Sequence, residues 1–368
     1  MDNTKINTWE LVSLTSVITF TPLLVTLPRS AAEAFGTGAL LHAIYIGIVV
    51  TIYFLAIFKL YKNIENKDIF DLSQIVGGNL LKILTGIVLI AYLLTTSFIT
   101  INEFSEDVKN VLFPDNSVQS VSIIFILGVA IAAYFGIKGA LRISSVLFPV
   151  LIIGLIAIFF SLLEDIDLLN LFPLIGTGRK EIFLNGLNHA GRYNSLFLIF
   201  ILAPKISNLK KSGMYSILST SAVILFVVFL IFSVIPYPEI SENYFAFFEI
   251  TRMISFGRFF QRVEVIFTFI WLFVSLVYLT IATAVIVYTF KKAFKIEYPN
   301  LLLPLITLSF IGLVYIFPDT SSLLITRDFM YSYVTPIIVF IYPLVLLIIA
   351  KFKYNLNQKG LMLQNEKT

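Results

Sequence analysis

Hydrophobic and polar positions alternate along this chain in blocks rather than residue by residue. Apolar runs of about 20 residues, nearly free of charge, are separated by short polar segments. A hydrocarbon core about 30 Å thick takes about 20 helical residues to cross, and only helices or closed barrels satisfy the backbone there. Continuous apolar runs exclude the two-residue alternation of a barrel strand. The pattern therefore predicts an all-α polytopic membrane protein.

Ten apolar runs define the predicted transmembrane helices. Residues 1–368 are expected to form a single transmembrane domain, with spans over about 11–350 and a short polar tail at 353–368. The first run lacks the cleavage site of a signal peptide, so we expect it to be retained as a helix. The spans are placed at residues 11–28, 39–60, 79–101, 121–135, 143–163, 182–203, 214–235, 263–290, 301–317 and 331–350.

The distribution of charge predicts the orientation. If the first segment is inside, most of the 26 lysines and arginines fall on inner loops. Acidic clusters, such as those within 103–107 and 164–167, fall on the opposite side. Because positively charged short loops stay in the cytoplasm, both termini are predicted to be cytoplasmic.

Composition narrows the class of function. Of all residues, 58% are hydrophobic and 13% are charged, outside the range of soluble domains. Cysteine is absent, and two histidines, His42 and His189, are too few for a histidine-rich metal site. No nucleophile motif or histidine–carboxylate pair indicates an enzyme, and the spread of basic residues does not indicate nucleic-acid binding. We expect no catalytic residue, metal or cofactor.

Two spans depart from a uniform apolar helix. In the first, Pro22 removes a backbone donor and collides with the preceding turn, beside the hydroxyls of Thr19 and Thr21. The sixth contains the polar segment 185–195. Breaks at matching positions of two five-helix halves are typical of inverted-repeat transporters. The alternative is an ordinary proline kink plus a water-exposed helix entrance.

An amino acid is a suitable ligand for such a site. Its carboxylate accepts hydrogen bonds from N–H groups at a helix N-terminus, and its ammonium lies against carbonyls and hydroxyls. Hydroxyls in spans three and eight add to the site, although helix-to-helix hydrogen bonding is their alternative use. The ligand-binding candidates from these patterns are Thr19, Thr21, Pro22, Thr96, Asn194, Ser195 and Tyr278.

Three charged residues are candidates for gating or charge pairing. Arg192 is costly inside a bilayer, which indicates a carboxylate anchor or an ion-path charge, unless it snorkels to the outer interface. Arg262 lies one turn from Arg258, so each needs a carboxylate such as Glu249 or Glu264. We therefore include Arg192, Arg262 and Glu264.

Short motifs in order along nearly the whole chain resemble one family. They are TLPR at 26–29, LFP at 147–149, FPLIGTG at 172–178, Pro204 with the basic loop to Lys211, QRVE at 261–264 with Trp271, and FPD at 317–319. In these the chain resembles the B subunits of bacterial spore germinant receptors, the GerAB-like members of the amino acid–polyamine–organocation (APC) superfamily.

The resemblance implies a five-plus-five inverted repeat (LeuT/APC-like) of ten helices, with helices one and six broken. It implies a nutrient germinant, commonly a small L-amino acid, bound centrally, and A and C partner subunits in the spore inner membrane. By the same likeness Tyr92 matches a tyrosine of the ligand pocket, and Thr21 and Pro22 fall where relatives unwind the first helix. The chain departs where relatives have small glycines at the first break, and at 196–198, where many have Gly-x-Glu.

Two functions remain open from sequence. One is a germinant-sensing subunit that uses a transporter fold as a receptor; the other is an amino-acid/proton or cation symporter, since fold does not fix function. A symporter is expected to carry a charged ion site deep in span one, five, six or eight. Spans one, five and eight show no such residue, which favours the receptor.

Overall fold

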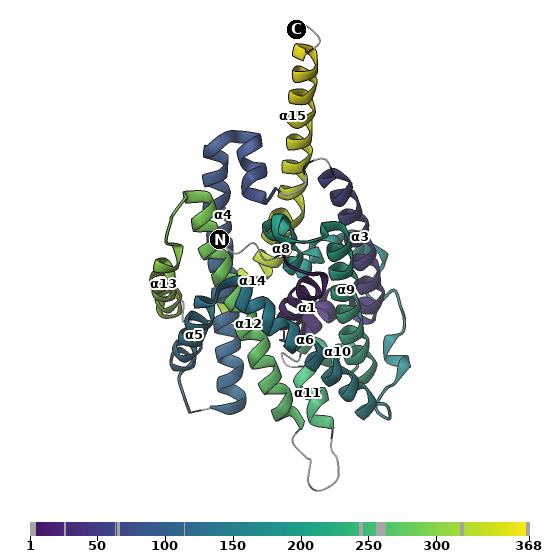
Figure 1. Cartoon of the computed structure of the whole chain (residues 1–368). Helices are drawn as coiled ribbons and strands as arrows, with labels where there is room; N and C mark the ends of the chain where they lie inside the picture. Colours follow the sequence, from purple (N-terminus) through teal and green to yellow (C-terminus); the bar gives the residue numbers. More distant parts are fainter. Residues whose placement is uncertain are drawn as a thin grey trace.

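The computed structural model describes residues 5–25, 27–62, 64, 67–113, 115–242, 246–254, 263–316 and 320–365. Over these residues the regular secondary structure is helical, apart from one isolated bridge between Ile6 and Ile206. The helices pack side by side into a bundle, and the end of α15 projects beyond it (Figure 1). Helices satisfy their own backbone hydrogen bonds, which is what an apolar environment requires.

The long helices account for most of the predicted spans. They are α1 (Thr8–Val25), α3 (Ala39–Tyr61), α4 (Ile69–Leu112), α5 (Val118–Tyr134), α6 (Gly136–Ser161), α9 (Leu209–Val234), α12 (Val263–Phe294), α13 (Leu303–Ile316) and α15 (Tyr342–Asn365).

Shorter elements connect or interrupt the long helices. They are α2 (Leu27–Phe35), η1 (Gly36–Gly38), η2 (Leu168–Leu171), α7 (Arg179–Phe183), η3 (Asn185–Phe197), α8 (Leu198–Leu202), η4 (Ala203–Lys205), α10 (Tyr237–Glu242), α11 (Ala246–Met253), η5 (Pro299–Leu302), α14 (Thr320–Phe329) and the π-helical turns η6 (Met330–Val334) and η7 (Ile337–Ile341).

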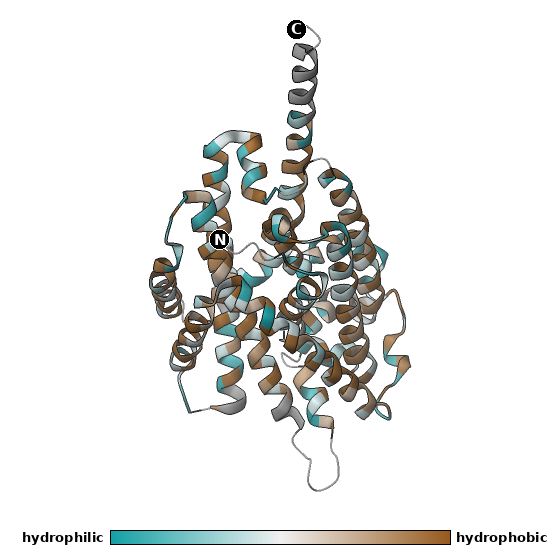
Figure 2. Cartoon of the chain, viewed as in Figure 1, coloured by the Kyte–Doolittle hydropathy of each residue, from teal (hydrophilic) through white to brown (hydrophobic). Residues whose placement is uncertain are grey.

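Among the described residues, seven helical stretches are long and apolar enough to cross a bilayer, and α5 is a shorter apolar helix. The two other predicted spans are those that contain the expected interruptions, so the arrangement is consistent with ten crossings. Hydrophobic residues predominate along the helices (Figure 2). Side chains such as Ile124 on α5 and Ile153 on α6 are more than 60% exposed, as expected for surfaces that face lipid.

Helix α1 runs through the middle of the bundle. It packs against α6, α9 and α12, and every residue from Leu11 to Thr21 is buried. A helix buried on all sides has no room for charge, and its polar groups are small hydroxyls. Thr15 and Thr19 donate hydrogen bonds to carbonyls of the preceding turn, at 3.0 Å to Leu11 and 2.9 Å to Thr15. This bonding within the helix satisfies their hydroxyls at the centre of the protein.

Pro22 does not interrupt the first helix, although the sequence predicted that it would. We expected the helix to break at Pro22, but α1 remains helical to Val25 and α2 begins at Leu27. A proline removes one hydrogen bond, and membrane helices tolerate that loss where neighbouring groups compensate. Thr21 is therefore part of a helical turn, and Thr26, between α1 and α2, lies outside the described residues.

The second interruption is confirmed as a long departure from α-helical geometry. The sixth span consists of α7, the thirteen-residue 3₁₀ segment η3, and α8. Runs of 3₁₀ helix longer than three or four residues are uncommon and mark strained or functional segments. Within η3, Tyr193 leaves helical geometry at φ −89° and ψ 26°.

Candidate functional site

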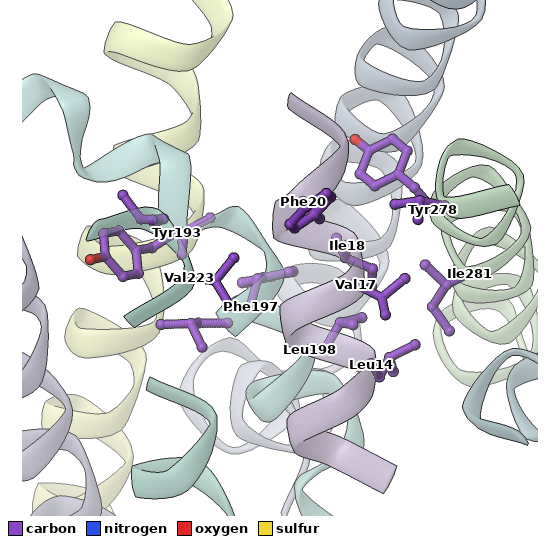
Figure 3. Close-up of a cluster of buried hydrophobic side chains, with 14 of the residues drawn as sticks. Leu14, Val17, Ile18, Phe20, Tyr193, Phe197, Leu198, Val223, Tyr278 and Ile281 are labelled. Carbon is purple, nitrogen blue, oxygen red and sulfur yellow. The ribbon is translucent and has the colours of Figure 1, made fainter. Parts of the chain in front are cut away.

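A cavity of about 50 Å³ lies where the interrupted sixth span meets α1, α4 and α12. Its polar lining comes from Tyr92 and Thr96 on α4, Asn194 and Ser195 on η3, and Tyr278 on α12. Its apolar walls include Ile18, Phe197, Leu198 and Ile281. Figure 3 shows Ile18 of α1 facing Tyr278 and Ile281 of α12.

Hydrogen bonds fix the polar side chains around this central cavity. The hydroxyls of Thr19 and Ser195 are 2.6 Å apart, which joins α1 to η3. The Tyr92 hydroxyl donates to Thr335 Oγ1 at 3.2 Å, and Thr96 donates to the Tyr92 carbonyl at 3.0 Å. Tyr278 lies within hydrogen-bonding reach of the Thr96 hydroxyl. These bonds fix the polar side chains that α1, η3, α4 and α12 contribute to the site.

One polar atom of the central cavity has no partner. Asn194 is 9% exposed, and its Oδ1 has no hydrogen-bond partner in the described part of the chain. Buried polar atoms are nearly always hydrogen-bonded, so this oxygen is available to accept a hydrogen bond from a water or a ligand. An asparagine amide both donates and accepts, which suits either group.

The structure brings together most of the residues predicted to bind ligand. Five line the central cavity, and Thr19 lies directly behind Ser195. Thr21 faces a separate cavity of about 20 Å³ nearer the C-terminal end of α4 and the N-terminal end of α12. The side chain of Pro22 lies outside the described residues, so its placement in the site stays a prediction.

Arg192 turns into the bundle rather than toward lipid. Its Nη2 donates to Ser30 Oγ on α2 at 2.9 Å, and its side chain lines another 50 Å³ cavity together with Arg327 and Asp328. Whether it acts as a charged anchor or reaches the membrane interface stays a prediction. The other two charged predictions remain untested, because Arg262 and the Glu264 side chain lie outside the described residues.

Close contacts hold the non-α segment η3 in place. A Cβ added at Gly191 would lie 2.2 Å from the Tyr331 carbonyl, so only glycine permits this approach of η3 to η6. At the start of η3, the distance between His42 Nε2 and the Gly186 carbonyl is 3.1 Å. The ring of His189 meets Phe35 edge-on, at 4.8 Å between centroids. Both histidines contact protein neighbours, in line with a packing role.

A buried charged cluster at the C-terminal end of α4 was not predicted from the sequence. We expected residues 103–107 to form a loop, but α4 continues to Leu112. Arg327 Nη1 lies 3.1 Å from Glu103 Oε1, and Asp107 is only 6% exposed. The helical spacing of apolar residues at 98, 101, 104 and 108 was the signal that could have extended the span.

A second ion pair lies at the opposite end of α4. Lys292 Nζ of α12 is 2.8 Å from Asp68 Oδ2, and the Tyr288 hydroxyl donates to the same oxygen at 3.0 Å. The Asp68 side chain also accepts from the Asp71 backbone N–H and so caps α4. Beyond Asp68, α4 turns sharply at Gly77 and Gly78, the latter with φ +68°.

A larger cavity of about 680 Å³ lies away from the central one. It is lined by the end of α3 and the segment from Ala203 to Lys210, including Lys59, Lys62 and Lys210. None of the predicted site residues contributes to it.

Comparisons with known proteins agree on family and fold. The chain is 25% identical over 252 residues to the spore germination protein GerQB of Bacillus cereus, covering 67% of this chain and 68% of that protein. Its structure is similar to an inward-facing conformation of Mhp1, with a TM-score of 0.60 over 96% of this chain and 78% of the other, at 12% identity. The latter likeness supports the predicted LeuT/APC-like architecture.

The family comparison covers most of the chain. The sequence model of the family described as spore germination protein matches residues 5–323, which include α1 to α13, η3 and every described residue of the central cavity. The chain therefore belongs to the spore germination protein family.

Proposed function

We propose that this protein is a germinant-sensing membrane subunit of a spore germination receptor, which binds a small L-amino acid in the central cavity. One observation carries the proposal: η3 presents Asn194 and Ser195 opposite Tyr92, Thr96 and Tyr278 around one cavity inside the bundle. Family membership and the transporter-like fold support the same reading.

The chemistry of the cavity suits a zwitterion with a short side chain. Its described lining holds hydroxyls and one amide but no charged group, so both charges of the ligand would be met by hydrogen bonds. A hydrogen bond to a charged group contributes about 1.5–3 kcal/mol. Ile18, Phe197 and Leu198 provide an apolar wall for a short aliphatic group.

Binding would require the cavity to widen. Its volume of about 50 Å³ suits a few water molecules, whereas ordinary ligand pockets start at about 300 Å³. A ligand that stabilises the widened state shifts the population of the whole bundle toward that state. We infer that partner subunits, by resemblance the A and C subunits in the spore inner membrane, detect this shift. The predicted cytoplasmic position of both termini belongs to the same proposal.

Ligand binding to purified protein tests the proposal. The full-length chain in lipid nanodiscs is titrated with a panel of labelled L-amino acids. We expect saturable binding of one or a few small members, weakened about tenfold by Asn194→Ala, since about 1.4 kcal/mol is lost with a good hydrogen bond. Asn116→Ala, at an exposed asparagine, is the matched control. Equal affinities of both variants would remove Asn194 from the site.

A symporter of amino acids with protons or cations is the second candidate. It is favoured by Asp107, a buried carboxylate of the kind that ion coupling uses, although it lies in span three rather than in the spans first considered. Uptake into proteoliposomes under imposed proton or sodium gradients separates the two. Binding without accumulation supports the sensor, and gradient-driven accumulation supports the symporter.

A further inference from the structure

The small cavity beside Thr21 gathers polar atoms that lack partners. It has a volume of about 20 Å³ and lies between α1, the C-terminal half of α4, α12 and η6. Asp107 Oδ2, Trp271 Nε1, Ser275 Oγ and Thr21 Oγ1 are all buried without a hydrogen-bond partner in the described part of the chain, and all four residues line this cavity. The four residues are each at most 6% exposed. Their convergence indicates a shared occupant, because buried polar groups are rarely left unpaired.

The charges around Asp107 leave it without a counterion among the described residues. On its own helix, Glu103 is paired with Arg327, and Glu106 is a second carboxylate. Lys109, two positions along, points away from Asp107. On α14, Arg327 is shared between Glu103 and Asp328.

The other neighbouring elements supply no cation either. The Arg192 guanidinium of η3 donates to Ser30, α5 carries no charged residue, and Tyr278 and Tyr331 bring neutral phenols. A buried carboxylate without a counterion is costly, so it takes up a proton or holds a cation.

The remaining groups decide which cation fits. The indole N–H of Trp271 presents the positive end of its dipole to the cavity, which opposes a metal ion but suits the oxygen of water. A volume of about 20 Å³ accommodates one water, for which about 10–15 Å³ is enough, and is too small for a hydrated cation. The hydroxyls of Ser275 and Thr21 provide the further partners that a buried water needs.

We propose that Asp107 is a proton-binding site of this protein, with one water held by Trp271, Ser275 and Thr21 as its proton donor and acceptor. A proton from solvent reaches the carboxylate through this water, which gives one of its own O–H protons to Asp107 as it accepts the incoming proton and so remains water. Release runs in reverse: the water accepts the Asp107 proton and passes one of its own back to solvent. The neutral acid avoids the cost of a buried charge. Loss of the proton leaves the carboxylate. This inference holds whether or not an amino acid binds in the central cavity.

Trp271 offers a direct measurement of the proposed proton. The chain has two tryptophans, so Trp9→Phe leaves Trp271 as the sole indole, beside the carboxyl in question. In the full-length protein without added amino acid, we expect Trp271 fluorescence to follow a one-proton titration. Asp107→Asn should abolish the titration, and Asp165→Asn, at an exposed aspartate, should retain it.

Two results would overturn the proposal. The first is a titration that persists in Asp107→Asn, and the second is a fluorescence change when sodium replaces a bulky organic cation at constant pH. Should Asp107→Asn not fold, Ser275→Ala and Thr21→Val keep the carboxyl but remove its neighbours. We expect them to shift the midpoint of the titration, and an unchanged midpoint in both would count against the site. Infrared difference spectra provide a second readout, in which the protonated-carboxyl band disappears with the titration.

Discussion

Thr19 of α1 and Ser195 of η3 share a hydrogen bond of 2.6 Å between their hydroxyls, and this bond joins the first and sixth spans. Both side chains are at most 2% exposed. Ser195 faces the central cavity, while Thr19 also donates to its own helix at Thr15. The orientation of Ser195, a proposed ligand-binding residue, therefore depends on Thr19, which does not line the cavity.

Removing either hydroxyl should weaken the same interaction. We expect Thr19→Val and Ser195→Ala each to lower thermal stability and amino-acid affinity, and the double variant to fall short of additivity by about 1 kcal/mol. A double-mutant cycle on the denaturation midpoint measures the coupling. Thr307→Val is the control, because its hydroxyl bonds only to Leu303 of its own helix, and it should be additive with Ser195→Ala.

The Tyr92 hydroxyl should matter for binding more than for folding. Tyr92→Phe removes the donor to Thr335 at the cavity edge and keeps the ring that packs there. We expect a roughly tenfold loss of amino-acid affinity with a stability change near 1 kcal/mol, measured by ligand titration and by thermal unfolding. Tyr298→Phe, at a tyrosine that is 71% exposed, is the matched control. Equal binding by the two variants would argue against a ligand contact at Tyr92.

The pair between Glu103 and Arg327 should stabilise the bundle at the C-terminal end of α4. Their side chains are 24% and 11% exposed, so Glu103→Gln leaves the largely buried Arg327 with the exposed Asp328 in place of its buried partner. We expect Glu103→Gln to destabilise by about 3 kcal/mol, seen as a lower unfolding temperature in detergent. Glu249→Gln, which breaks the exposed pair with Arg252, should cost less than about 1 kcal/mol. Similar losses in both variants would contradict a buried role for Glu103.

The contact of η3 with η6 should tolerate no side chain. Gly191→Ala places a methyl group against the Tyr331 carbonyl and forces the two segments apart, with loss of binding and of stability. Gly312→Ala is the matched control, because nothing lies within 4 Å of its added Cβ. In the helical setting of α13 that change should stabilise by about 0.5–1 kcal/mol. A benign Gly191→Ala would show that the segments separate easily.

The sequence predicted the spans well because hydrophobic thickness sets helix length. It located the break in the sixth span, since asparagines, glycines and a histidine interrupt the apolar run at 185–195. It was wrong about a break at Pro22 in the first, because a proline inside a membrane helix does not by itself end it: α1 continues to Val25.

The charged cluster at the C-terminal end of α4 was not predicted, for a different reason. Charged residues in a single sequence indicate a loop, and only tertiary contacts show that Glu103 meets Arg327, more than two hundred positions away. The meeting of Asn194, Tyr92 and Tyr278 likewise depends on how helices distant in sequence pack together, which spacing along the chain does not encode.

Two bonded pairs of helical segments lie on either side of the central cavity. Asp68 and Lys292 tie α4 to α12 as one unit, and Thr19 and Ser195 tie α1 to η3 as another. The central cavity lies at the interface between these two units. Tyr92 and Tyr278 line it from one unit, and Ile18 and Asn194 line it from the other. A rocking motion of one unit against the other would therefore open or shut the cavity while leaving both ties intact.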